Sequence, residues 1–234
     1  MKTKLMLVGA LTTALALVAG VAYADFTPAF ELALSDTKAG GNPNFDIHLE
    51  FDENDEEIAN FKMTIPKGYV IAGDDDIPDS STVPGQPARS GEDIGGGTVV
   101  IAAGPACRPG PEGGIPVKQN VTINAEIYER TRTDAEANAG VHAVWFLDLE
   151  PANRVRLLVS GSPETGWTVE GAPTASDNTC NPLTVDLTIE GKTADGTPVI
   201  TNPVKPGKAK FMAEIFSQDS PSVATFLPVF KITK

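Results

Sequence analysis

Two clusters of acidic side chains are the clearest candidates for chemistry in this sequence. "DENDEE" covers residues 52–57 and "DDDIPD" covers residues 74–79. A calcium ion binds several carboxylate oxygens within reach of one loop, and the candidate ligands are Asp52, Asp55, Asp74 and Asp76. Neither cluster has the spacing of an EF-hand, and acids also terminate turns and keep exposed loops hydrated. We therefore predict no cofactor, with calcium as the alternative.

Aromatic and imidazole side chains form a second set of candidates. Trp167 follows Gly166 at the start of a predicted strand, where an exposed indole ring could stack on a sugar. Trp145 lies in an almost wholly apolar segment, so we expect it in the core. His48 alternates with apolar residues, and we expect it, like His142, to face solvent rather than to act as a general base.

Motifs that would indicate an enzyme are absent from the sequence. There is no G-x-S-x-G elbow, no H-E-x-x-H pair and no glycine-rich phosphate loop between a strand and a helix. A glycoside hydrolase needs only two suitably spaced carboxylates, and such a pair cannot be recognised among 31 acidic residues. We expect a protein without catalytic activity, with a carboxylate-based hydrolase as a remote alternative.

The first 24 residues have the features of a secretory signal peptide. Lys2 and Lys4 precede a mostly apolar run over residues 5–22, which ends in the small-x-small sequence of residues 22–24. An uncleaved membrane anchor is the alternative, because the run is almost long enough to span a bilayer. We expect a secreted or cell-surface protein that has no membrane segment once residues 1–24 are removed.

The cysteines and the net charge agree with that location. Cys107 and Cys180 are the only cysteines, and outside the cytoplasm such a pair is expected to form a disulfide. A zinc site is not indicated, because two thiols and two scattered histidines lack ligand spacing. The formal net charge of −13 disfavours nucleic acids and anionic membrane surfaces as partners.

Apolar and polar residues alternate along several segments. In residues 45–51, four apolar residues alternate with polar ones, and this pattern predicts a half-buried strand. The same alternation occurs in residues 61–65, 121–127, 183–189 and 211–215. Shorter apolar segments that predict further strands are "TVVIAA" (98–103), "AVWFLDL" (143–149), "RVRLLVSG" (154–161), "GWTVEG" (166–171), "PVIT" (198–201) and "FLPVFKIT" (226–233).

Many short strands separated by glycine and proline predict an all-β fold, specifically an immunoglobulin-like β-sandwich of one or two packed units. "DENDEE" stands where a hairpin between the first two alternating strands would reverse. One short helix is expected where Thr133, Glu136 and Gly140 provide a capping box and a C-terminal stop.

Two irregular segments suggest the domain organisation. Residues 72–97 are rich in Gly, Pro, Ser and Asp and predict a long surface loop. Residues 104–116 are the candidate boundary between two units. We therefore predict a signal peptide at 1–24, an N-terminal β domain at 25–110 and a C-terminal β-sandwich domain at 111–234.

"SDTKAGGNPNFDIHLEF" followed by "IANFKMTIPKGYVIAG" carries a recognisable pattern. It resembles uncharacterised secreted β-rich proteins of high-GC bacteria, which have a T-x-A-G-x-x-P turn, an alternating strand and a strand that ends in Pro-x-Gly. The matching residues are Thr37, Ala39, Gly40, Pro43, Phe45, Leu49, Ile65, Pro66 and Gly68. Asn42 replaces the histidine usual in that turn, and the cysteines that commonly follow the Pro-x-Gly step are missing. The resemblance implies a secreted β domain and no activity.

These observations favour an exported, non-enzymatic protein with a structural or adhesive role at the cell surface or in the extracellular space. Its expected partner is a cell-envelope protein or a glycan. The alternative is a β module that binds calcium or a carbohydrate through the 72–97 loop and Trp167.

Overall fold

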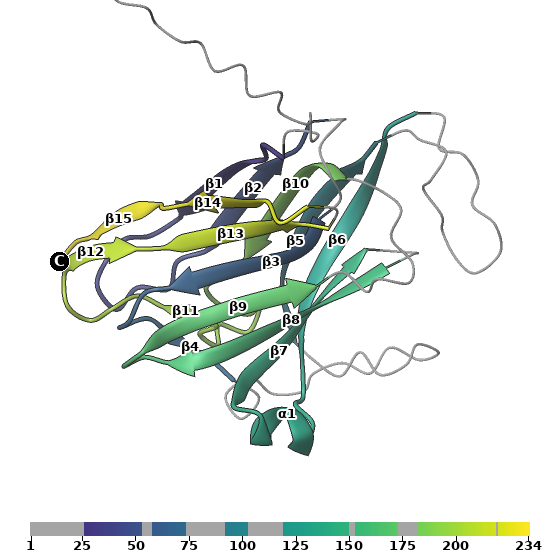
Figure 1. The fold of residues 1–234 in the computed structure, drawn as a ribbon. Coiled ribbons are helices and arrows are strands. Elements are labelled where there is room, and N and C mark those ends of the chain that lie inside the picture. The colour runs from purple at the N-terminus through teal and green to yellow at the C-terminus, as the bar shows by residue number, and fades with distance from the viewer. Residues whose placement is uncertain are drawn as a thin grey trace, which may run out of the picture.

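The computed structural model of the protein describes residues 26–52, 58–73, 92–102, 119–149, 153–172, 182–218 and 220–234, most of which form strands (Figure 1). The strands are β1 (Ala29–Leu34), β2 (Phe45–Glu50), β3 (Ile58–Ile65), β4 (Val70–Ile71), β5 (Asp93–Ile101), β6 (Val121–Arg130), β7 (Val141–Leu149), β8 (Asn153–Ser162), β9 (Gly166–Ala172), β10 (Pro182–Ile189), β11 (Ile200–Thr201), β12 (Gly207–Lys210), β13 (Met212–Ser217), β14 (Val223–Phe226) and β15 (Val229–Ile232). The helix is α1 (Asp134–Asn138).

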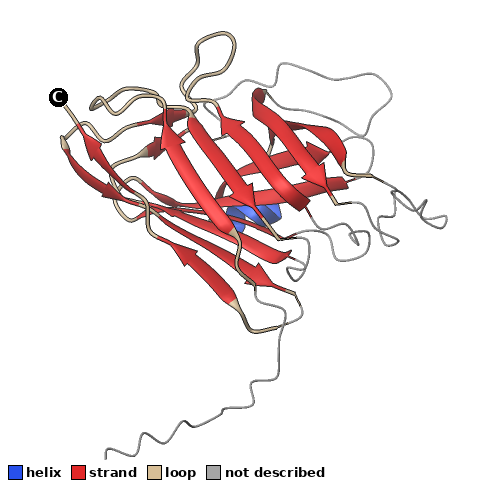
Figure 2. Ribbon diagram, turned by 90° about the horizontal axis from the view of Figure 1, so that it is seen from above, coloured by secondary structure: helices blue, strands red, loops and turns tan. Residues whose placement is uncertain are grey.

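Eleven of the strands form one sheet in the order β1-β2-β10-β5-β6-β7-β8-β9-β3-β13-β14. Every neighbouring pair in this sheet is antiparallel. The sheet curls until it is nearly barrel-shaped, so that its strands lie on opposite sides of a common interior (Figure 2). Two small antiparallel sheets, β4 with β11 and β12 with β15, accompany it.

The predicted all-β class is confirmed, but the immunoglobulin-like sandwich is not, because one sheet curls on itself where a sandwich needs two. Strands from residues 25–110 and from residues 111–234 also interleave: β10 lies between β2 and β5, and β3 lies between β9 and β13. The buried apolar residues that the structure describes form one hydrophobic core. The proposed boundary between two domains stays a prediction.

The predicted hairpin between residues 45–51 and 61–65 is wrong. β2 pairs with β1 and β10, whereas β3 pairs with β9 and β13. Alternation in a sequence indicates which face of a strand is buried but not which strand lies beside it. The partner on one side of β2 is β1, a strand that the sequence analysis did not predict.

In β2, alternating burial agrees with the predicted strand. In β2, Phe45, Ile47 and Leu49 are buried, while Asp46 and Glu50 are exposed. At one end of the interior an aromatic cluster fills the space: the ring of Phe45 lies 6.0 Å from Tyr69 and 5.6 Å from Phe211 between centroids. These edge-to-face contacts add to the stabilisation from apolar burial.

Strand β5 begins inside the segment that was predicted to be a loop. Gly95, Gly96 and Gly97 pair with β10 on one side and with β6 on the other. A Cβ atom at these positions would lie 2.0 Å from the Thr188 carbonyl oxygen, 2.5 Å from that of Ala125 and 1.9 Å from that of Asp186, respectively. The glycines contributed to the prediction of a loop, but in the structure close strand packing requires them.

The predicted helix is confirmed together with its cap. Thr133 is the N-cap of α1: its hydroxyl accepts a hydrogen bond from the Glu136 amide, and the Glu136 carboxylate accepts one from the Thr133 amide. Gly140 follows with a φ of 80°, which glycine adopts without strain. The helix connects β6 to β7 at one end of the sheet (Figure 1).

Several sequence predictions lie outside the described residues. These are the signal peptide at 1–24, the Cys107–Cys180 disulfide, the candidate boundary at 104–116 and residues 74–91 of the predicted loop. Within the part of the chain that the structure describes, no helix has the length and apolar character needed to span a membrane.

Gly97→Ala tests the close packing of β5. The added methyl group would overlap the Asp186 carbonyl oxygen, so β10 and β5 must separate. We expect the free energy of unfolding, measured by urea titration, to fall by about 3 kcal/mol. The control is Gly207→Ala, whose added Cβ atom would have no neighbour within 4 Å. Equal stability of the two variants would show that β10 and β5 are not in close contact.

Candidate ligand-binding cavity

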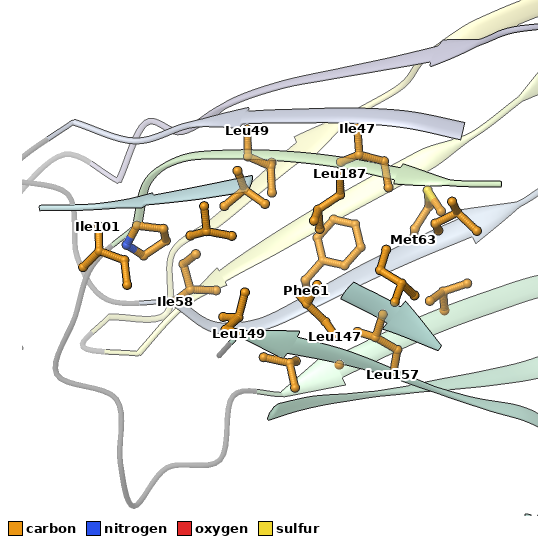
Figure 3. Close-up of a pocket in the computed structure, with 18 of the residues that line it drawn as sticks. Ile47, Leu49, Ile58, Phe61, Met63, Ile101, Leu147, Leu149, Leu157 and Leu187 are labelled. Carbon is orange, nitrogen blue, oxygen red and sulfur yellow. The ribbon is translucent and has the colours of Figure 1, made fainter. Parts of the chain in front are cut away.

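The interior of the curled sheet contains an apolar cavity of about 190 Å³. It is lined by inward-facing side chains from β2, β3, β5, β6, β7, β8, β9 and β10. Figure 3 shows lining side chains that point toward one another from strands on opposite sides of the interior. The lining residues labelled there are Ile47, Leu49, Ile58, Phe61, Met63, Ile101, Leu147, Leu149, Leu157 and Leu187.

The cavity lies where the strands contribute aliphatic rather than aromatic side chains to the interior. Beyond Ile47 and Met63, the next inward positions are Phe45 and Ile65, and Phe45 belongs to the aromatic cluster. Aromatic rings therefore fill one part of the interior. In the other part the strands contribute mainly Leu, Ile and Val, whose side chains are too short to meet at the centre.

One end of the cavity lies where several strands begin or end. Ile58 begins β3, Ile101 ends β5, Leu149 ends β7 and Pro182 begins β10. Gln218, which follows β13 and is exposed, also lines the cavity. At this end lies Gln218, the only polar residue among the described residues that line the cavity.

The lining determines what the cavity can do chemically. Among its described residues there is no acid, base, thiol or hydroxyl, so this lining provides no group for proton transfer or nucleophilic attack. Apolar cavities without polar partners do not hold ordered water and can bind apolar molecules. The cavity is therefore suited to binding by dispersion and the hydrophobic effect.

Trp167 was expected to be exposed and is buried, with 2% of its surface accessible. In β9 it pairs with Ile65 of β3, and its indole N–H donates a 2.9 Å hydrogen bond to the Tyr69 carbonyl oxygen. Its ring lies 4.6 Å from that of His142, which is partly buried rather than facing solvent. Trp167 presents no open face for a sugar. Trp145 is fully buried, as predicted.

His48 lies on the outer face of β2, partly exposed, between two carboxylates. Its Nδ1 atom is 2.6 Å from Oδ1 of Asp186, and its Nε2 atom is 3.2 Å from Oε1 of Glu50. The hydrogen bond with Asp186 raises the pKa of His48 above its ordinary value, Glu50 adds to this, and desolvation opposes it. The two carboxylates therefore favour the imidazolium form of His48 over the neutral ring.

The other predicted site residues give no assembled site. Asp52 follows β2 and is exposed, whereas Asp55, Asp74, Asp76, Cys107 and Cys180 lie outside the described residues. Among the residues that the structure describes, no three His, Cys, Asp or Glu side chains are grouped so that they could hold a metal ion. Calcium binding and the disulfide stay predictions.

Comparison with known proteins does not assign the chain to a family. No protein-family model matches the chain, and a search of the curated proteins found no significant match. The sequence analysis did not identify the cavity, although the signal was present. The alternating aliphatic residues that predicted the strands are largely the residues that line it.

Proton binding by His48 gives a testable pH dependence. Since its pKa is raised in the folded protein, His48 stabilises the fold below its unfolded pKa of about 6.5. This contribution is lost as the pH rises through the folded pKa. In NMR titrations we expect Asp186→Asn to lower the pKa of His48, and to lower it more than Glu50→Gln does. A pKa that does not change in Asp186→Asn would contradict the assigned cause.

Proposed function

We propose that the protein is a non-enzymatic binding protein that holds a small apolar molecule, or the apolar end of a larger one, inside its curled sheet. The observation that carries this proposal is the cavity of about 190 Å³, to which eight strands contribute apolar side chains. Protein interiors are otherwise packed with few voids larger than a water molecule. An internal space of this size is a cost to stability that a bound ligand would offset.

The size of the cavity limits the ligand. A cavity of roughly 150 Å³ lined by aliphatic and aromatic side chains holds one benzene ring. This interior is somewhat larger and suits a single substituted ring or a short aliphatic chain. For a ligand of that size we expect a binding free energy of about −6 kcal/mol, which corresponds to a dissociation constant of tens of micromolar.

The polarity of the lining limits the ligand further. A hydroxyl or amide group placed among Leu147, Val169 and Leu187 would lose its hydrogen bonds to water without replacement, a cost of about 1–3 kcal/mol. A ligand with a polar head would therefore place it toward Gln218, the one polar residue among the described residues that line the cavity.

Of the functions expected from the sequence, some are compatible with this proposal and one loses its support. A structural or adhesive role of an exported protein is compatible with it and stays a prediction. Binding of a sugar through Trp167 loses its support, because that ring is buried. Calcium binding rests mainly on Asp55, Asp74 and Asp76, which lie outside the described residues.

Filling the cavity should abolish binding. Val99 is buried and lines the cavity, so the ring of Val99→Phe would occupy part of the empty volume. Using hexanol and toluene as probes and calorimetric titration as the measurement, we expect Val99→Phe to bind at least about tenfold more weakly than the unmodified protein. Because the cavity has spare volume, stability should change by less than about 1 kcal/mol.

Val100→Phe is the matched control, since Val100 is the next residue on β5 and faces the opposite side of the sheet. It should bind both probes as well as the unmodified protein does. Saturable binding that is equally strong in both variants would place the ligand outside the interior. No saturable binding to the unmodified protein would reject the proposed function.

A further inference from the structure

The eleven-stranded sheet has two free edges, which are formed by β1 and β14. All ten neighbouring pairs are antiparallel, so the first and the eleventh strand run in the same direction. A parallel bridge between Lys38, which follows β1, and Thr233, which follows β15, is consistent with this common direction. The two edges therefore approach each other with parallel polarity.

Among the described residues, backbone hydrogen bonds join the two edges at one end, beyond β1 and β15. The Ala39 amide donates to the Thr233 carbonyl oxygen at 2.9 Å, and the Thr233 amide donates to the Thr37 carbonyl oxygen at 2.8 Å. Further along, within the described residues, β1 pairs only with β2 and β14 only with β13. There the edges meet through the rings of Phe30 and Phe226, whose centroids are 5.5 Å apart.

We call this unpaired part the open seam. Its groove is lined by Phe30, Glu31, Leu32, Thr225, Phe226, Leu227 and Pro228. Apolar side chains are unusually exposed along the β14 side: Val223 is 43% and Leu227 is 68% accessible. Exposed apolar residues beside unpaired strand edges are typical of surfaces that bind another polypeptide.

We propose that the open seam binds an extended segment of a partner protein as a twelfth strand, antiparallel to both β1 and β14. With eleven antiparallel strands, direct closure requires one parallel pair, whereas one inserted strand makes every pair antiparallel. Such a segment would satisfy backbone groups on both edges at once, which is the recognition mode of strand addition. This proposal does not depend on a ligand in the interior.

The groove specifies the chemistry of the segment. Phe30 and Phe226 already touch, so the inward side chain between them must be small, such as alanine. The outward side chain next along lies between Glu31 and the exposed Leu227. Lysine or arginine suits this position, because its stem packs on apolar surface while its charge meets the carboxylate. The net charge of −13 also favours a basic partner.

The length of the segment is set by β1, which has six residues and so spans about 20 Å. A matching probe is an acetylated peptide with the sequence threonine-valine-lysine-alanine-lysine-valine-threonine. Its valine and alanine side chains would point inward and its lysines outward. Fluorescence anisotropy of the labelled peptide with the full chain measures binding, and we expect it to be saturable with one peptide per chain.

N-methylation of the peptide distinguishes insertion from simpler binding. In an extended strand, alternate amides point to opposite edges, so methylating one alternate set blocks hydrogen bonds to β1 and the other set blocks those to β14. We expect each modified peptide to bind at least about tenfold more weakly. If one of them binds normally, the segment pairs with a single edge and insertion is wrong. No saturable binding up to roughly millimolar peptide also overturns the proposal.

A charge variant locates the binding site. Glu31→Lys places a positive charge beside the peptide lysines and should weaken binding on the order of fivefold. Glu126→Lys makes the same change of net charge on the exposed face of β6, away from the seam, and should leave binding unchanged. Equal effects of the two variants would show that the peptide senses only the overall charge, which would contradict binding in the seam.

Discussion

Close backbone packing of β5 between β10 and β6, which leaves no room for a Cβ atom at three glycines, holds the two parts of the curled sheet together. Gly95 and Gly97 lie against the backbone of β10, and Gly96 lies against that of β6. Glycine within a strand marks tight bends and close backbone approach. β5 joins β1, β2 and β10 on one side to the strands that begin with β6 on the other, so its geometry connects the two parts of the curled sheet.

The curled sheet has two consequences that carry the functional proposals. Its interior is filled by aromatic rings around Phe45 and Phe211 in one part, whereas the aliphatic part keeps a cavity of about 190 Å³. Its edge strands, β1 and β14, run in parallel because the number of antiparallel strands is odd, and they do not pair with each other. The interior and the open seam thus arise from the same topology but would bind different partners, a small apolar molecule and an extended peptide.

Local features of this fold could be predicted from the sequence. The alternation in residues 45–51 indicated which side chains of β2 are buried, and the capping box of Thr133 and Glu136 located α1. Pairing could not be predicted, because β2 joins β10, whose residues lie far along the chain. The buried state of Trp167 escaped prediction for the same reason, since β3, which lies beside it, is distant in sequence.

Xenon binding in a crystal would show whether the interior of the curled sheet contains an apolar cavity that accepts a ligand. Xenon enters dry apolar cavities and has no chemistry of its own. In a crystal equilibrated with pressurised xenon, we expect an anomalous peak among Leu147, Val169 and Leu187. An interior without xenon, in which these side chains close on one another, would contradict it.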